Sequence, residues 1–272
     1  KGNWQSYSSF MARQLTELLT NYGKIGAIWF DGLWDHDEDT VPFNWELPQQ
    51  YALIHGLQPA CLIGNNHHIT PFEGEDIQIF ERDVPGENTA GLSGQAISRL
   101  PLETCQTMNG MWGYRIVDQN YKSPEQLVRL LVRTSAKGAN LLLNIGPQPD
   151  GNLPAAALER LEALGKWMSR NGGSIYGTTA GEFVQGDSIV STRKGETLFL
   201  HVLADGIRDI ELPLQKKPAS VTLFPSGKKL NCTYTATSAK GRRGKKYDKK
   251  PGTLKITLPE RSGAWDTIVM II

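Results

Sequence analysis

The sequence predicts an α/β domain followed by an antiparallel β-sandwich. Two observations support this prediction. Up to about residue 176, apolar runs suited to buried strands alternate with amphipathic helices. After Tyr176, short β-type segments are separated by turn-forming residues at regular intervals, as in a sandwich. We place the boundary between the two domains at residues 178 and 179.

The α/β part alternates helices and strands from its first residues. An amphipathic helix is expected over residues 8–22, where Gly23 supplies a C-terminal stop. The Ser123 segment forms a capping box with proline at the first helical position, and this opens another helix. Further helices are expected over residues 45–57 and 154–170, and strands over residues 25–30, 60–63, 76–80, 102–106 and 139–145.

These four or five buried strands are too few for a closed barrel. A complete (β/α)8 barrel typically needs about 250 residues. Residues 1–178 are therefore predicted to be only the C-terminal portion of a (β/α)8-type barrel, and residues 179–272 a sandwich. Its strands are expected over residues 188–192, 197–202, 207–212, 219–224, 253–258 and 267–272, with the basic run 240–250 as a solvated loop.

The composition excludes several classes of function. The 272 residues have a formal net charge of +1, so no global basic surface points to nucleic acid. No run of eighteen apolar residues is present, which predicts no membrane span. The three cysteines show neither metal-type spacing nor a disulfide framework. The seven Trp and eight Tyr fit sugar binding or simply a filled core.

Asp31 is the first candidate catalytic residue. It closes an apolar strand, and Gly32 after it lets the chain turn away. In parallel α/β folds, functional groups lie at the carboxyl ends of strands. A buried charge without a partner is costly, so this carboxylate must face an opening or contact a neighbour. We interpret it as a nucleophile or base with Trp29 in the pocket floor; the alternative is an Asp that caps the following loop.

Glu81 is the second candidate, at the end of another β-like stretch. Partial burial would raise its pKa, as a general acid requires. From the local sequence, an exposed loop Glu paired with Arg82 explains the pattern equally well. Four other glutamates compete for the role: Glu73, Glu75, Glu87 and Glu103.

Three further motifs have weaker signals. Gly110 and Gly113 bracket Trp112 in a turn that could present its ring, although a core Trp is the alternative. The pair His67 and His68 is interpreted as a polar strand end rather than a ligand set. The acidic cluster 34–39 lacks metal-binding spacing and is expected to be a solvated loop, so we expect no metal there.

Two carboxylates at strand ends, with aromatic side chains nearby, suit glycoside hydrolysis. Four segments point further when they are taken together and in order. They are Trp29–Gly32 (WFDG), Pro101–Tyr114 (PLETCQTMNGMWGY), Leu141–Gly151 (LLLNIGPQPDG) and Leu164–Thr178. In combination they resemble the retaining α-L-fucosidases of glycoside hydrolase family twenty-nine. That family also has a C-terminal sandwich.

The resemblance implies cleavage of terminal α-linked L-fucose from an oligosaccharide or glycoconjugate by double displacement, without a cofactor. Asp31 matches the family's nucleophile position, and Glu81 matches the general acid/base of its larger branch. Trp29 and Trp112 match positions that wall the fucose pocket, and Asn66 falls near a sugar-contacting position. The substrate class implies a periplasmic, secreted or lysosomal location.

The resemblance also implies further barrel strands and fucose-contacting His residues before Lys1. We therefore expect this chain to be a fragment, or its N-terminal half to lie elsewhere, with sheet edges and apolar helix faces left bare. The alternative function is a non-catalytic carbohydrate-binding or structural piece of such an enzyme. A retaining glycosidase for another sugar is a third hypothesis.

Overall fold

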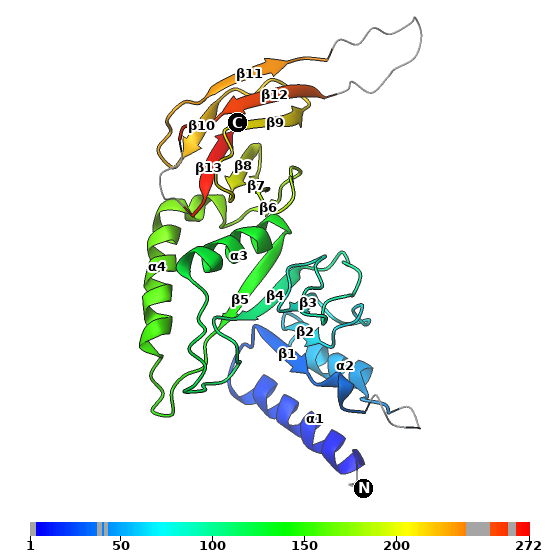
Figure 1. Ribbon diagram of the computed structural model, residues 1–272. Helices are drawn as coiled ribbons and strands as arrows, with labels where there is room; N and C mark the ends of the chain where they lie inside the picture. Colours follow the sequence, from blue (N-terminus) through cyan, green and yellow to red (C-terminus); the bar gives the residue numbers. More distant parts are fainter. Residues whose placement is uncertain (1–3, 37–39, 41–42, 238–250, 261–264) are drawn as a thin grey trace, which may run out of the picture. The chain divides into compact units, whose positions relative to one another are not determined.

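The structure is a computed structural model that describes residues 4–36, 40, 43–237, 251–260 and 265–272 (Figure 1). Its contacts divide the chain into two compact units. The first comprises Lys1–Gln106 and Ala139–Leu143, and the second Thr107–Gly138 and Asn144–Ile272. Each unit has its own core of buried apolar side chains.

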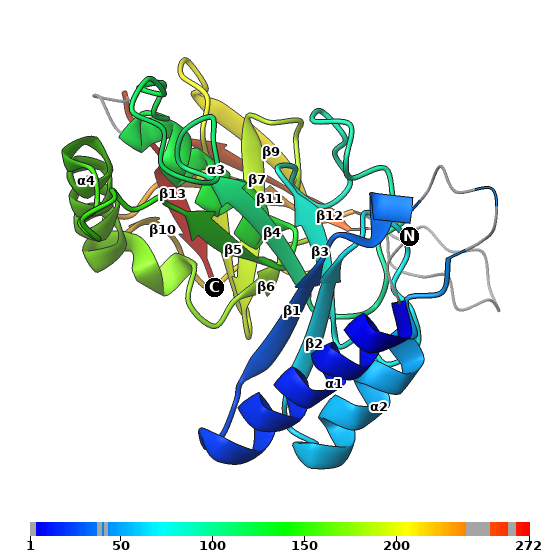
Figure 2. The same cartoon turned by 90° about the horizontal axis from the view of Figure 1, so that it is seen from below.

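The first unit is built on a five-stranded sheet in the order β1-β2-β3-β4-β5 (Figures 1 and 2). Neighbours from β1 to β4 pair in parallel. The carboxyl ends of these strands therefore meet at one edge of the sheet, where functional groups of parallel folds collect. The strands are β1 (Ala27–Asp31), β2 (Leu62–Asn66), β3 (Ile77–Glu81), β4 (Leu102–Thr107) and β5 (Ala139–Asn144).

Two helices, α1 (Trp4–Asn21) and α2 (Leu47–Leu57), lie side by side against β1 and β2 (Figure 2). A short 3-10 turn, η1 (Leu33–His36), follows β1. The core beneath the helices is fully apolar apart from one phenol, and its buried members are Leu15, Leu19, Phe30, Tyr51, Ile54, Cys61 and Ile63. This core supports the strands whose ends bear the candidate residues.

Helix α1 begins four residues earlier than the sequence predicts, because its first residue is held by aromatic contacts. The Trp4 ring lies 4.3 Å from Phe43 and 5.2 Å from Trp45, edge to face in both cases. Such pairs stabilise beyond the area they bury. The helix ends at Asn21, one residue before the predicted end, and Gly23 follows with a φ of 82° that suits only glycine without strain.

The expectation that β1 is buried on both faces is wrong. Phe30 is its one buried residue, and Trp29 is 41% exposed. The reason is that β1 lies at the edge of the sheet and pairs only with β2. At the opposite edge, Leu142 of β5 is also exposed, as is Phe10 on α1. These exposed side chains lie at the sheet edges and on a helix face, where the sequence predicts apolar surface to be left bare.

The second unit begins with helices α3 (Pro124–Ala136) and α4 (Ala155–Asn171), followed by η2 (Gly172–Ser174). The predicted capping box of α3 is confirmed. Ser123 Oγ accepts from the Gln126 N–H at 3.2 Å, and Gln126 Oε1 accepts from the Ser123 N–H at 2.8 Å. Both bonds satisfy backbone donors that a helix N-terminus otherwise leaves unpaired.

Two antiparallel sheets complete the second unit, one in the order β10-β13-β8-β7-β6 and one in the order β11-β12-β9. Alternate residues of both sheets point into a shared apolar core, in which Leu200 and Leu254 are fully buried. The strands are β6 (Thr179–Ala180), β7 (Ile189–Lys194), β8 (Thr197–Val202), β9 (Asp209–Leu214), β10 (Val221–Phe224), β11 (Asn231–Thr235), β12 (Gly252–Thr257) and β13 (Thr267–Ile271).

The coarse fold class, a parallel α/β sheet followed by antiparallel sheets, is thus confirmed. The sequence missed β6 and β11. Strand β6 has only two residues, and β11 is largely exposed and has no apolar alternation, so pairing with β12 alone defines it. The boundary at residues 178 and 179 stays a prediction. The basic run 240–250 lies outside the described residues.

The buried side chains of the sandwich core should dominate the stability of the second unit. We expect Leu254→Ala to cost about 2–5 kcal/mol in the free energy of unfolding, because it leaves a cavity at a fully buried position. The matched control is Leu158→Ala, since Leu158 is 51% exposed on α4 and should change stability by less than about 0.5 kcal/mol. Urea unfolding of both variants checks this, and equal midpoints would contradict it.

Candidate active site

Two carboxylates lie close together at the carboxyl ends of the parallel strands. Asp31 is the last residue of β1 and Glu81 the last of β3, while Asn66 ends β2 between them. The Asn66 Nδ2 group donates to Asp31 Oδ1 at 3.1 Å and to Glu81 Oε2 at 2.8 Å. The two acceptor oxygens can therefore be at most about 5.9 Å apart. The structure brings together three residues that the sequence identified separately.

Strand geometry explains the convergence. Asp31 and Asn66 are direct partners in the parallel register of β1 and β2. Side chains alternate between the two faces of a strand, so the preceding Asn65 points to the opposite face. There its Nδ2 donates to the Tyr51 hydroxyl of α2 at 2.8 Å. The chain turns away after Asp31 at Gly32, whose φ of 94° lies in the region that favours glycine.

A third polar side chain contacts Glu81. His68 Nε2 lies 2.9 Å from Glu81 Oε2, the oxygen that also accepts from Asn66. The His68 ring is stacked on Trp34, with centroids 4.9 Å apart and planes 5° from parallel. The sequence predicts only a polar strand end for the histidine pair and does not indicate this contact. His68 lies beyond the end of β2 with a φ of 64°, so strand alternation does not predict the side to which it points.

The neighbouring His67 serves a different network. Its Nε2 lies 3.0 Å from Glu75 Oε1, which also accepts from the Tyr51 hydroxyl at 2.9 Å. His67 and Glu75 are both buried, so Glu75 is committed to holding α2 against the strands. Glu103 of β4 accepts from Trp29 Nε1 at 3.1 Å. Of the five glutamates that the sequence left open, Glu81 is the one that shares a hydrogen-bond donor with Asp31.

The two predicted tryptophans lie in different units. Trp29 precedes Asp31 by two residues and therefore lies on the same face of β1, with 41% of its surface exposed. Trp112 belongs to the second unit, where its carbonyl accepts from Asn144 Nδ2 at 2.7 Å. Its loop passes so close to Gly146 that a Cβ there would lie 2.4 Å from the Tyr114 nitrogen. A sugar-walling role for Trp112 stays a prediction.

The electrostatics of the carboxylate pair correct one expectation. Burial raises the pKa of Asp31, and the nearby charge of Glu81 adds to this, against the hydrogen bonds from Asn66 and the Gly32 N–H. Burial also acts to raise the pKa of Glu81. However, the hydrogen bonds from Asn66 and His68, with the positive charges of His68 and Arg82, outweigh it and lower that pKa. The sequence predicted a raised value from burial alone; it indicated Arg82 as a possible partner but not Asn66 or His68.

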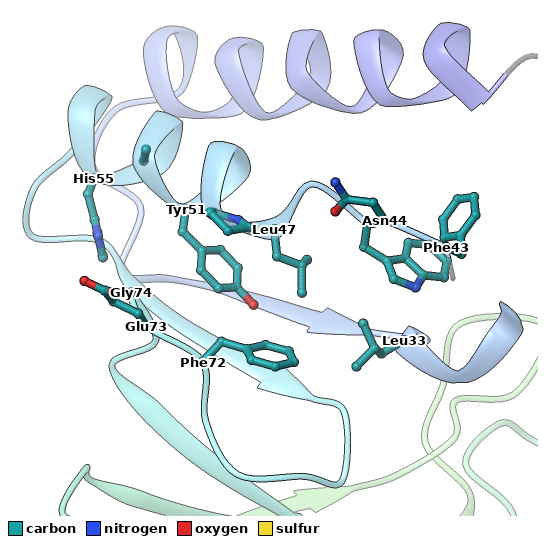
Figure 3. A pocket seen from close by; sticks show the side chains of 12 residues that line it. Leu33, Phe43, Asn44, Leu47, Tyr51, His55, Phe72, Glu73 and Gly74 are labelled. Atoms are coloured by element: carbon teal, nitrogen blue, oxygen red, sulfur yellow. The ribbon is translucent and has the colours of Figure 1, made fainter. Parts of the chain in front are cut away.

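A pocket of about 670 Å³ lies elsewhere in the first unit (Figure 3). Tyr51, Leu47 and His55 line it from α2, while Phe72 approaches from the segment before β3 and Leu33 from the turn after β1. Neither Asp31 nor Glu81 lines it. This pocket is therefore lined by other residues than the carboxylate pair.

Within the described ranges, no three His, Cys, Asp or Glu side chains come together as a metal site would require. In the same residues no helix has both the length and the apolar character needed to cross a bilayer. Part of the acidic cluster after Trp34, residues 37–39, lies outside the described residues. The groups at this site that can take part in chemistry are therefore two carboxylates, an amide and an imidazole.

Comparison with known proteins decides the family. The model of the α-L-fucosidase family matches residues 1–173. The chain belongs to the α-L-fucosidase family. Human tissue α-L-fucosidase is 34% identical over 247 residues, which are 82% of this chain and 49% of that protein. Human plasma α-L-fucosidase is 43% identical over 185 residues, which are 55% of this chain and 40% of that protein.

Solved structures of the family agree. The α-L-fucosidase isoenzyme 1 of Paenibacillus thiaminolyticus is 31% identical with a TM-score of 0.76, covering 100% of this chain and 63% of that one. A Thermotoga maritima α-fucosidase in complex with fucose is 23% identical with a TM-score of 0.69, covering 98% of this chain and 57% of that one, and it supports the fold alone. The chain spans about half the length of the first of these curated relatives.

The amide of Asn66 should influence the pKa of both carboxylates. Because the Asn66 amide lowers the pKa of Asp31 and of Glu81, Asn66→Ala should raise both pKa values. Protonation of the two groups would then begin at higher pH, which a ¹³C NMR titration of the side-chain carboxyls measures. The control is Asn21→Ala at the exposed end of α1, which should leave both titrations unchanged. Unaltered titrations in Asn66→Ala would contradict the bridge.

Proposed function

We propose that the intact protein releases terminal α-linked L-fucose from glycans with retention of configuration. The observation that supports this most directly is the amide of Asn66 shared by Asp31 and Glu81. It holds their acceptor oxygens within about 5.9 Å. Retaining glycosidases place their two carboxyl groups about 5–5.5 Å apart, whereas inverting enzymes need about 6.5–9.5 Å to admit a water.

The first step uses both carboxylates at once. An Asp31 oxygen attacks the anomeric carbon of the fucoside, and the bond from that carbon to the leaving oxygen breaks. Glu81 gives its proton to the leaving oxygen and becomes a carboxylate. In the second step Glu81 takes a proton from water as the water oxygen attacks the anomeric carbon. The bond to Asp31 then breaks and free fucose leaves.

The surroundings of the two carboxylates bear on the protonation of each. The charge of Glu81 raises the pKa of Asp31. The partners of Glu81 lower its pKa and favour its ionised form. Positive charge that develops at the anomeric carbon in the transition state favours ionised Asp31, while the leaving oxygen takes the proton of Glu81.

The aromatic side chains would supply the binding surface. The C–H-rich face of a pyranose packs on an aromatic ring, and Trp29 exposes part of its indole on the face of β1 that bears Asp31. Its Nε1 is held by Glu103, which restrains the ring. We assign a sugar-walling role to Trp112 through the family motif alone, and we assign Asn66 to the orientation of both carboxylates and to contact with the sugar. No metal or organic cofactor takes part in this proposal.

We further propose that β1 to β5 form part of a (β/α)8 barrel closed by strands outside this sequence. Strands β1 and β5 are the two edges of the sheet, and neighbouring strands would pair with them there and cover exposed side chains such as Leu142 of β5. The residues up to 178 would belong to that barrel and residues 179–272 to the sandwich. We infer a periplasmic, secreted or lysosomal location, and the name of the plasma relative supports the secreted option.

The exposed edge strands β1 and β5 favour a second function for the chain by itself. The chain spans about half of its first curated relative, so by itself it would be a non-catalytic carbohydrate-binding or structural fragment. A chromogenic aryl fucoside separates the two functions. We expect turnover by the intact protein and none by residues 1–272 alone, because the open sheet lacks part of the pocket. Turnover by residues 1–272 alone would exclude the fragment hypothesis, and faster turnover of another aryl glycoside would exclude fucose.

Azide should separate the roles of the two carboxylates in the intact protein. Asp31→Gly should lose roughly a thousandfold or more of its turnover, because no covalent intermediate forms. Added azide then attacks from the vacated side and yields the β-fucosyl azide. Glu81→Ala should lose roughly a hundredfold or more on substrates with poor leaving groups. There azide attacks the fucosyl-enzyme and yields the α-fucosyl azide, which NMR distinguishes from the β anomer.

Matched controls come from glutamates outside the pair. Glu73→Ala and Glu87→Ala remove carboxylates that the sequence alone could not exclude, and both should retain the parent turnover. If Asp31→Gly kept full activity, the nucleophile would be wrongly assigned. If Glu81→Ala produced no α-fucosyl azide while Glu87→Ala did, the general acid/base would be Glu87.

A further inference from the structure

His68 and Asn66 contact the same oxygen of Glu81, and the other oxygen forms an ion pair with Arg82. Their nitrogens lie 2.9 Å and 2.8 Å from Oε2. The other oxygen, Oε1, is 3.8 Å from Arg82 Nε, beyond hydrogen-bond range. The two oxygens of one carboxyl group are therefore chemically distinct in this site.

The imidazole is held in place from several directions. The Trp34 indole is stacked on it nearly parallel, which fixes the plane of the ring. The backbone of His68 is in the left-handed region with a φ of 64°, and so is that of Arg82 with a φ of 63°. Residues other than glycine adopt this conformation at a cost, and such strain persists where the surroundings hold it, often at functional sites.

We propose that His68, clamped by Trp34, is a positioning residue that fixes Glu81 through Oε2, so that Oε1 carries the proton given to the leaving group. This inference rests on the proposed function. In the protonated acid, Oε2 still accepts hydrogen bonds while Oε1 bears the hydrogen. The His68 Nε2–H can therefore donate to Oε2 both before and after the proton leaves. The Glu81 carboxyl then keeps one orientation through both steps.

Several charged or titratable groups face Glu81. Asp31 approaches from β1, His68 from the end of β2 and Arg82 from the end of β3 itself. Glu103 and Cys105 lie on β4, where burial raises the pKa of the Cys105 thiol to about 12, so it stays neutral in ordinary assays. Removing His68 takes away one hydrogen bond and one positive charge that lower the pKa of Glu81. Asp31 and Arg82 remain.

The test is His68→Gln in the intact protein, assayed on aryl fucosides with leaving groups of graded acidity. The general acid must be protonated, so loss of His68 should move the basic limb of the kcat/KM profile to higher pH. Loss of orientation should lower kcat roughly tenfold or more for poor leaving groups and less for good ones. The control is His55→Gln, which removes another histidine–carboxylate pair, to Asp76 at 3.0 Å, and should keep the parent profile.

Trp34→Ala should shift the profile in the same direction by a smaller amount, and it serves as the test variant if His68→Gln does not fold. An unchanged pH limb with an unchanged leaving-group dependence would overturn the inference. A ¹³C titration of Glu81 provides a readout without turnover. Its pKa must rise in His68→Gln and not in His55→Gln. If the parent protein does not cleave fucosides, the proposed function fails, while this titration still decides whether His68 governs Glu81.

Discussion

The site depends on one amide that is shared by two acids. Asn66 Nδ2 donates to a carboxylate on each side, and its residue is almost fully buried, so the strand fixes where the amide can point. Two carboxylates this close would repel each other when both are ionised. The shared donor offsets part of that repulsion and sets their separation. In the proposed function, this separation is what favours retention over inversion.

The Asn66 amide is held in position because the side chains of this segment bond to different partners on its two sides. Asn65 and the following His67 bond to Tyr51 and Glu75, on the side where α2 packs. Asn66 and His68 reach the carboxylates on the other side. The outer network anchors β2 to its helix by buried hydrogen bonds, which are costly to leave unsatisfied. These buried hydrogen bonds on the side of α2 thus help to fix the backbone that carries Asn66 and His68.

Asp31 and Glu81 also differ in the groups that surround their carboxylates. Asp31 is exposed on one side and has an amide and a backbone N–H as partners, while Glu81 has an amide, an imidazole and a nearby guanidinium. In the resting site this favours the charge on Glu81. In the proposed reaction Glu81 must instead be protonated when the leaving oxygen departs, while Asp31 is ionised.

The sequence by itself determined the order and type of nearly all elements, because apolar periodicity and helix caps are local properties. It also identified Asp31, Glu81 and Asn66 as separate strand ends, and four ordered motifs indicated the family. It could not predict that one amide joins the two acids, nor that His68 and Trp34 belong with them. Those contacts join β1, β2 and β3 across 35 and 15 residues of chain, so only the parallel pairing creates them. The exposure of β1 was likewise decided by its place at the sheet edge, and the lowered pKa of Glu81 by partners that no local pattern records.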